Sequence, residues 1–214
     1  MLSNYQKVLF LGCHLDDIEF GCGGMIAKYA NSSTDIYLAT LSVSNMNSQG
    51  KIQLVRNKNE SYKAAEFLGV SKDNLYFGKC FGQVFDLNRQ SVREELLNLR
   101  KLFNPDAVFY PAKNDTHQDH SALSDEAFRI FRNVSCFGYE VIRSSFNFFP
   151  QVYVEISENN LRSKSNAVMA YRSQLQESAG YYFDKSVIFS NAQFRGTQVG
   201  VKYSEAFECY RAIY

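Results

Sequence analysis

KVLFLGCHLDDIEFGCGGMIAKY, residues 7–29, is the stretch of sequence that decides the fold. Its first five residues form a short apolar run that predicts a buried strand, and Gly12 ends the run. Residues 18–29 then have a helical pattern, with Gly23 and Gly24 in the first turns. A strand, a loop and a helix in this order form the first part of a βαβ unit.

The same unit recurs along the chain. Apolar or β-branched runs at residues 34–41, 75–77 and 107–110 predict further strands. Helical patterns cover residues 52–68, 91–103 and 121–132, and a polar stretch at 42–50 precedes the first of them. Strands that alternate with helices imply right-handed crossovers. We therefore expect an α/β protein with a Rossmann-like, mostly parallel sheet and helices on both of its faces.

The pattern changes in the C-terminal third. Residues 145–150 and 151–156 are expected to form antiparallel strands, and residues 158–176 a helix. The residues after 176 give no pattern that we can assign. The chain has no internal repeat, low-complexity segment or linker, so we expect residues 1–214 to form a single domain.

Charge and composition exclude several classes of protein. Lys and Arg number 23 against 22 Asp and Glu, without a block of like charges, which argues against a nucleic-acid-binding protein. The longest clean apolar run, Val8 to Leu11, is too short for a membrane span or a secretory signal, so no membrane partner and a cytoplasmic location are expected. The five Cys include no C-x-x-C pair and predict buried free thiols. Strand alternation is expected to turn Cys13 to the face opposite His14.

The three histidines of the chain all follow predicted strand ends in the company of carboxylates. His14 precedes Asp16 and Asp17 after the first strand, and His117 and His120 follow the strand at 107–110. Because ligands bind at the carboxyl ends of strands in open α/β sheets, these side chains should meet at one edge. Imidazole and carboxylate groups suit Zn²⁺, Fe²⁺ or Co²⁺, and three protein ligands with an open position are typical of a catalytic metal.

Such a metal would activate water and polarise a carbonyl oxygen, as amide hydrolysis requires. The reaction also needs a base near the water. One of Asp16 and Asp17 can bind the metal while the other takes the proton, and their spacing alone does not decide between them.

The two histidine segments resemble a known family. His14-Leu15-Asp16-Asp17-Ile18-Glu19 with Gly23-Gly24, together with His117-Gln118-Asp119-His120, is similar to the paired signature of the PIG-L/LmbE zinc-dependent N-deacetylases. These act on N-acetylglucosaminyl-phosphatidylinositol, mycothiol and bacillithiol precursors, and diacetylchitobiose. Further blocks in the family's order extend the resemblance over nearly the whole chain: Arg56 with Glu60, Ala64 to Gly69, Pro105 to Val108, Lys164, Ala170 to Gln174, Arg195-Gly196 and Tyr203 to Phe207.

The resemblance implies a role for each matching position. It makes His14, Asp17 and His120 the zinc ligands and Asp16 the general base. His117 would stabilise the oxyanion and serve the leaving amine. By the same resemblance, Asp119 would fix the tautomer of a histidine.

Other positions keep two interpretations. Arg56 is expected to bind substrate, with a solvated helix charge as the alternative, and Asp115 either contacts the sugar or caps a turn. Gly21, Gly23 and Gly24 do not match a phosphate-binding spacing and are interpreted as close helix packing. Leu15 departs from the proline that is usual in the family, which puts the rigidity of this loop in doubt.

The resemblance implies a zinc-dependent hydrolase that removes the N-acetyl group from an amino sugar of the N-acetylglucosamine type or its glycoside. Fe²⁺ is a possible alternative metal, and a homo-oligomer, trimer or hexamer, is a further expectation. Two alternatives stay open: hydrolysis of an N-formyl or non-sugar amide, and a non-catalytic module that binds a sugar or nucleotide sugar. A binding module has no need of a base beside the water, and Asp16 and His117 therefore argue against it.

Overall fold

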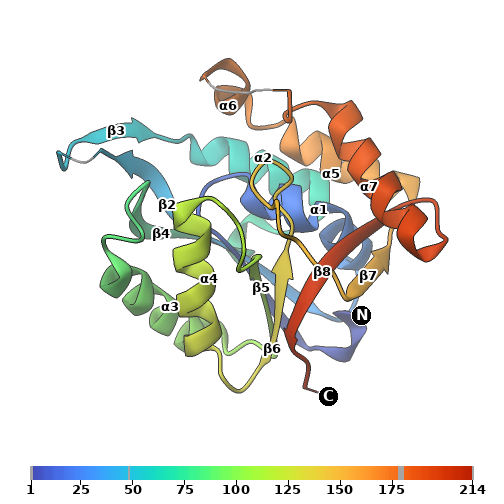
Figure 1. Cartoon of the computed structure of the whole chain (residues 1–214), viewed down its shortest axis with the longest axis horizontal. Helices are drawn as coiled ribbons and strands as arrows, with labels where there is room; N and C mark the ends of the chain where they lie inside the picture. The colour runs from blue at the N-terminus through green and yellow to red at the C-terminus, as the bar shows by residue number, and fades with distance from the viewer. Residues whose placement is uncertain (1, 48, 178–180, 214) are drawn as a thin grey trace.

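The computed structural model describes residues 2–47, 49–177 and 181–213 and contains one sheet of eight strands (Figure 1). The strands are β1 (Lys7–Gly12), β2 (Asp35–Met46), β3 (Ile52–Val55), β4 (Leu75–Gly82), β5 (Ala107–Pro111), β6 (Ser135–Tyr139), β7 (Val152–Glu155) and β8 (Ser204–Arg211). Their order is β3-β2-β1-β5-β6-β8-β7, and β4 also pairs with β2.

The pairing of the strands creates a crevice at one edge of the sheet. β1 runs parallel to β2 on one side and to β5 on the other, while β4 and β6 extend the parallel part outward. After β1 the chain continues to β2 on one side of β1, and it later returns to form β5 on the other side. The loops after β1 and β5 therefore separate at a switch point, which is where open α/β sheets bind ligands.

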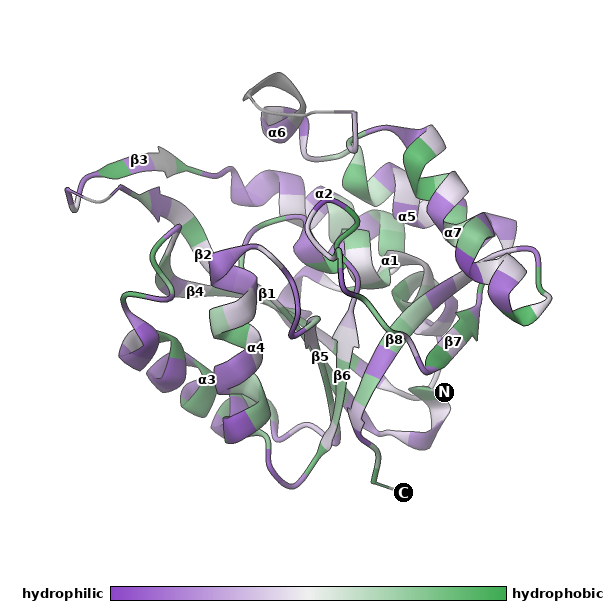
Figure 2. Ribbon diagram, viewed as in Figure 1, coloured by the Kyte–Doolittle hydropathy of each residue, from purple (hydrophilic) through white to green (hydrophobic). Residues whose placement is uncertain are grey.

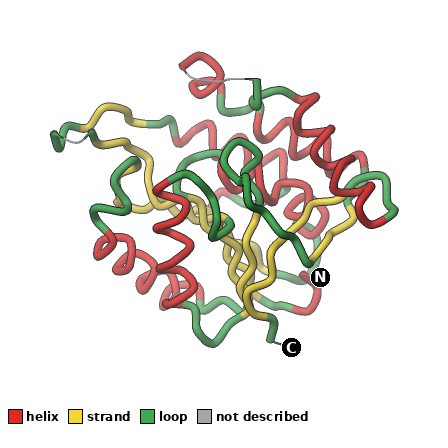
Figure 3. The backbone as a smooth tube through the Cα atoms, viewed as in Figure 1, coloured by secondary structure: helices red, strands yellow, loops and turns green. Residues whose placement is uncertain are grey.

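Helices cover both faces of the sheet (Figure 3). They are α1 (Asp17–Tyr29), α2 (Lys58–Leu68), α3 (Arg89–Phe103), α4 (Gln118–Ile130), α5 (Glu158–Val168), α6 (Arg172–Glu177) and α7 (Lys185–Val199), with short 3₁₀ turns at Leu2–Asn4 and Lys72–Asn74. Val8 and Phe10 belong to the core that includes α1, α2, α5 and α7, whereas Leu9 and Leu11 pack with α3 and α4. This alternation confirms a mostly parallel sheet covered on two sides.

Hydropathy follows this layering (Figure 2). The strands between the helical layers are largely apolar, and the exposed residues of α3 are mainly polar, whereas α4 also buries polar residues, among them Asp119 and His120. All five Cys are free, and every one except Cys209 is buried, as expected. Within the described residues, no helix combines the length and the apolarity that crossing a membrane requires.

Several predicted boundaries are wrong. Residues 52–68 do not form one helix: Ile52–Val55 is strand β3, and α2 begins at Lys58 after Asn57, whose side chain accepts a hydrogen bond from the backbone of Asn59. Residues 145–150 form turns and irregular backbone, and the predicted helix at 158–176 is divided into α5 and α6.

The part of the sequence that we could not assign holds α7 and β8. β8 lies between β6 and the edge strand β7 and is antiparallel to both. From it, the buried Glu205 carboxylate accepts hydrogen bonds from the backbone amides of Gly24 and Met25 and from Lys164. The C-terminal strand thus fixes the helix that begins at Asp17.

Candidate metal centre and active site

The loop between β1 and α1 is organised by a carboxylate that folds back on it. Asp17, the first residue of α1, accepts hydrogen bonds at Oδ2 from the backbone amides of Cys13 (2.9 Å) and His14 (2.8 Å). Arg56 donates to the carbonyl oxygen of Leu15 at 3.1 Å, and the Leu15 side chain is buried in the core. These contacts hold the loop without the proline that is usual in the family.

The loop after β5 presents the second motif. Asp115 accepts a hydrogen bond at Oδ1 from the backbone amide of His117 (2.9 Å), and His117 in turn accepts one at Nδ1 from the amide of Asp119 (3.2 Å). His117 is the N-cap of α4, so Asp119 and His120 lie in the first turn of this helix. Capping therefore determines which way the motif enters the crevice.

Asp17 lies between His14 and His120, the other two metal ligands predicted from the sequence. Its Oδ2 is 3.5 Å from His14 Nδ1, and its Oδ1 is 3.3 Å from His120 Nε2. The three side chains are almost completely buried. The structure thus brings together donors from the loop after β1, from α1 and from α4, and the last of these lies more than 100 positions from the other two in the sequence.

Each histidine has a second carboxylate on its other ring nitrogen. Asp119 Oδ2 is 2.8 Å from His14 Nε2, and Asp115 Oδ2 is 3.2 Å from His120 Nδ1. Asp119 is further fixed by the backbone amides of Gln83 and Phe85. The Asp115 side chain is fully buried and also accepts hydrogen bonds from two serine hydroxyls. Paired carboxylates of this kind orient histidines around metals.

The electrostatics of this cluster fit a cation. Burial lowers the pKa of His120, but the carboxylates of Asp17 and Asp115 outweigh it and raise the pKa to about 10. Burial opposes ionisation of Asp17, yet His120 and His14 hold its pKa well below its usual range. Both ring nitrogens of His120 are buried without a well-aligned hydrogen bond. A buried imidazole among carboxylates, with no aligned partner, is a donor set suited to a divalent metal.

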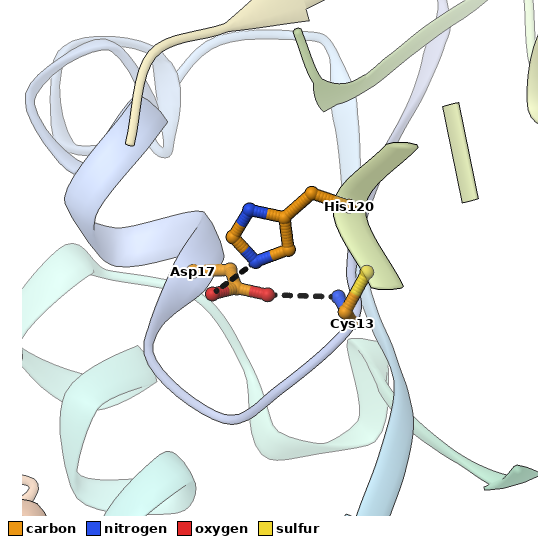
Figure 4. A group of neighbouring side chains, drawn as sticks. All are labelled: Cys13, Asp17 and His120. Atoms are coloured by element: carbon orange, nitrogen blue, oxygen red, sulfur yellow. Dashed lines mark hydrogen bonds and ion pairs between the residues drawn. The ribbon is translucent and has the colours of Figure 1, made fainter. Parts of the chain in front are cut away.

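Cys13 lies closer to this cluster than the sequence suggests (Figure 4). Its side chain packs with Leu9 and Leu11, as strand alternation predicts. Its sulfur nevertheless belongs to a group of possible ligand atoms, with Asp17 and His120, that all lie within 4.8 Å of one another. Cys13 thus lies on the face that strand alternation predicts, yet its sulfur is still close to Asp17 and His120. A second such group is formed by His14, His117 and Asp119.

Asp16 has an unusual backbone and a nearby cation. Its φ of 108° lies in the left-handed region, which is costly for a residue other than glycine and is often found at functional sites. Its Oδ1 is 3.9 Å from Arg56 Nη1. Burial and the charge of Asp17 raise the pKa of Asp16 to about 7, although Arg56 and His14 act in the opposite direction. A carboxyl group with this pKa can exchange protons near neutral pH.

His117 is positioned to donate a hydrogen bond. Burial and the positive charges of His14 and His120 lower its pKa to about 4, so its imidazole is neutral at pH 7. Because Nδ1 accepts from the backbone amide of Asp119, the proton of the neutral ring is assigned to Nε2. The ring centroid lies 4.8 Å from that of His14 and 4.5 Å from that of His120.

These groups line a cavity of about 380 Å³. His14, Asp16, Asp17, Arg56, His117 and His120 all contribute to its wall, whereas Asp115 and Asp119 lie behind it. Further residues of the wall were not predicted individually, because no motif or spacing marks them; they include Asn45, Gln83, Arg143 and Tyr182. Gln174 also lines the cavity and falls in one of the blocks of the family resemblance.

Comparison with known proteins agrees with this geometry. The profile of PIG-L, described as GlcNAc-PI de-N-acetylase, matches residues 9–131, more than half of the chain. The chain belongs to the PIG-L family. The matched region contains both motifs of the cavity, from His14 to His120. The expectation of a hydrolytic N-deacetylase is confirmed by this match.

Two curated proteins match over most of their length. The chain is 26% identical over 187 residues to the uncharacterized deacetylase YaiS of Escherichia coli strain K12, covering 81% of this chain and 96% of YaiS. It is 23% identical over 234 residues to diacetylchitobiose deacetylase of Thermococcus kodakarensis, and the match covers 99% of this chain and 86% of that protein. Among solved structures, the conserved protein TT1542 from Thermus thermophilus superposes with a TM-score of 0.75 at 25% identity, over 98% of this chain and 96% of that one.

Proposed function

We propose that this protein is a zinc-dependent hydrolase that removes the N-acetyl group from an N-acetylated amino sugar or its glycoside and releases acetate. The observation that carries the proposal is the arrangement of Asp16 and His117 on one cavity wall beside His14, Asp17 and His120. The family match and the resemblance to diacetylchitobiose deacetylase support the reaction and the class of substrate.

We assign His14, Asp17 and His120 to hold the metal, zinc or Fe²⁺. When bound, such an ion supplies Lewis acidity for a carbonyl oxygen and lowers the pKa of water. Asp119 holds His14 and Asp115 holds His120, each through the ring nitrogen that faces away from Asp17. We therefore assign Asp115 to position His120 rather than to contact the sugar, since its carboxylate is enclosed.

The proton transfers are assigned to two residues of the wall. Asp16 takes the proton from the water that attacks the amide carbonyl carbon, and Arg56 holds the Asp16 carboxylate. His117 donates a hydrogen bond from Nε2 to the oxygen on which negative charge develops. As the carbon–nitrogen bond breaks, the amine nitrogen takes a proton from the protonated base, so that acetate and a free amino sugar leave.

The decisive experiment combines metal analysis with a screen for acetate release from N-acetylglucosamine, its methyl glycoside and diacetylchitobiose. Purified protein reconstituted with Zn²⁺ is expected to release acetate, and the Asp16→Asn variant is not. Release of formate from N-formyl analogues alone would redirect the proposal to another acyl group. Binding of these sugars without any acyl release would indicate a non-catalytic module.

A further inference from the structure

The loop after β6 is attached to the centre of the site. Ser144 and Ser145 donate hydrogen bonds from their hydroxyls to Asp115 Oδ2 at 2.9 and 3.0 Å, the same oxygen that lies 3.2 Å from His120 Nδ1. The backbone amide of Thr116 donates to the carbonyl oxygen of Ser144 at 3.0 Å. The position of this loop relative to His120 is therefore fixed.

Arg143, the residue before these serines, lines the cavity and rests on an aromatic ring. The centre of its guanidinium lies 5.0 Å from the ring centroid of Tyr182. The ring centroid of Tyr182 lies 5.5 Å from that of the buried Phe20, which belongs to α1. Stacking on an aromatic face holds an arginine in place and leaves the edge of its guanidinium free to form hydrogen bonds.

The guanidinium of Arg143 has fewer polar partners within the protein than that of Arg56, the other arginine of the wall. Arg56 bonds to the Leu15 carbonyl and faces Asp16. In the part of the chain that the structure describes, no carboxylate lies within 4.0 Å of Arg143, and its polar contact is a weak hydrogen bond to the Tyr182 hydroxyl at 3.5 Å. Most of its five N–H donors are thus available to a molecule in the cavity.

The acidic groups of the wall already have partners. Asp17 lies between two histidines, and Asp16 faces Arg56. Arg143 is consequently the cation of this wall that no described carboxylate offsets, and it lies at the exposed side of the cavity. A planar guanidinium matches the paired oxygens of a carboxylate or a phosphate better than it matches a sugar hydroxyl.

We propose that Arg143 binds an anionic substituent, phosphate or carboxylate, on the substrate. The substrate class is then an N-acetylated amino sugar that carries a negative charge away from the amide. This inference rests on the proposed deacetylase function and adds a specificity-determining residue to it. Substrate without the charge still reaches Asp16 and His117, so Arg143 acts on binding more than on the chemical step.

The test compares acetate release from matched substrates: methyl N-acetylglucosaminide, N-acetylglucosamine 1-phosphate and the N-acetylglucosaminide of glycolic acid. Wild type is expected to show a lower KM for at least one anionic substrate, and the two anionic substrates distinguish phosphate from carboxylate. Arg143→Gln should raise that KM about tenfold or more, since charge-assisted hydrogen bonds are lost. The KM for the methyl glycoside and every kcat should change less than about twofold if Arg143 contributes binding alone.

Two further variants serve as controls. Arg143→Lys should recover part of the lost affinity, because it keeps the charge without the planar donors. Arg129→Gln removes the same charge from an exposed position in the last turn of α4, at the other end of this helix from His120, and should leave all KM values unchanged. Added salt should raise the KM of the anionic substrates and not that of the methyl glycoside.

Failure of this inference differs from failure of the proposed function. Equal KM values for neutral and anionic substrates, or an equal effect of Arg143→Gln on both, would overturn the role of Arg143 and leave the deacetylase intact. If no substrate releases acetate, the role of Arg143 is tested by binding alone. Calorimetry then measures the binding of N-acetylglucosamine 1-phosphate and of the glycolic acid glycoside to the Asp16→Asn protein. Loss of that binding in the double variant with Arg143→Gln supports the anion site, and no binding or unchanged binding contradicts it.

Discussion

His14 Nε2 and Asp119 Oδ2 lie 2.8 Å apart although 105 positions separate them in the sequence. Burial opposes the ionisation of Asp119, but its bond to His14 and the amides of Gln83 and Phe85 lower its pKa. An ionised carboxylate only accepts hydrogen bonds, so His14 donates from Nε2. Burial lowers the pKa of His14, but Asp17 and Asp119 outweigh it and raise this pKa. When the ring loses a proton, its lone pair is on Nδ1, which faces Asp17. This pairing therefore suits the metal-ligand role that we propose for His14.

Metal content tests the ligand set. Purified protein is expected to hold about one divalent cation per chain, as a three-ligand site does. His14→Ala, Asp17→Ala and His120→Ala should each reduce this occupancy, measured by plasma mass spectrometry after dialysis. His117→Ala is the matched control and should keep the metal, because the proposal gives this ring a role toward substrate. Full occupancy in all three ligand variants would refute the assignment.

Asp119→Ala tests the carboxylate behind His14. Loss of such a partner typically weakens metal affinity about 10- to 100-fold. We expect a change of this size in competition with a chelator, with the fold retained in circular dichroism. An unchanged affinity would show that the contact with His14 does not prepare the site.

The adjacent acids Asp16 and Asp17 should respond differently to the same substitution. Asp16→Asn keeps the shape of the side chain and removes the proton acceptor, so kcat is expected to fall about 10²- to 10⁴-fold at normal metal occupancy. Asp17→Asn should instead weaken metal binding, and high zinc should partly restore activity. The reverse pattern would exchange the roles of the two residues.

Arg56 allows a test of pH dependence. The pKa of Asp16 is raised to about 7 by burial and by Asp17, and the charge of Arg56 partly offsets this rise. Asp16 must be ionised to accept a proton, so activity should increase with pH through its pKa. A bound divalent cation also lowers this pKa, which places the acidic limb of kcat/KM between the ordinary aspartate value of about 4 and 7.

Replacing Arg56 with Gln removes the offsetting positive charge and should move that limb to higher pH, while metal content is kept. Arg56→Lys serves as the control, because it preserves the charge and should leave the limb near its original position. A limb that does not move in Arg56→Gln, together with a raised KM, would favour the direct contact with substrate that the sequence predicts for Arg56.

The location of the site could be predicted from the sequence because it depends on strand ends. β1 ends at Gly12 and β5 at Pro111, and neighbouring parallel strands place the residues that follow them at one edge. The partners of the two histidines could not be predicted. Asp119 directly precedes His120 in the sequence, but side chains of successive helix residues point about 100° apart. Asp119 therefore contacts His14, while His120 contacts Asp17 and Asp115.

The boundary at β3 shows a different limit. Ile52 and Val55 have a spacing that suits a helix, and the sequence therefore predicts one helix over residues 52–68. In the structure both side chains are exposed, at 55% and 71%, on the extended arm that β3 forms with the end of β2. Apolar periodicity predicts an element only where burial selects it. Likewise, Arg143 and Tyr182 meet through tertiary packing, which leaves no local pattern.

Gly21 provides a test of how helix packing supports the metal centre. A Cβ at this position of α1 would lie 2.1 Å from Cδ2 and 2.6 Å from Cγ of Tyr139. The Tyr139 ring is fully buried, and its hydroxyl donates to the carbonyl oxygen of Leu11 at 2.7 Å, so it cannot move aside freely. Gly21→Ala must therefore displace α1, whose first residue is Asp17, or disrupt the packing at the end of β1.

We expect Gly21→Ala to lower the free energy of unfolding by about 1–3 kcal/mol or more, measured by chemical denaturation, because buried side chains are forced apart. It should also weaken metal affinity, since Asp17 shifts with the helix. Gly200→Ala is the matched control: its φ of 75° is unfavourable for alanine at a cost of about 1–2 kcal/mol, but the added Cβ meets nothing within 4 Å. It should lose stability and keep its metal affinity. If Gly21→Ala retained both its stability and its metal affinity, the interpretation of this glycine as close helix packing would be wrong.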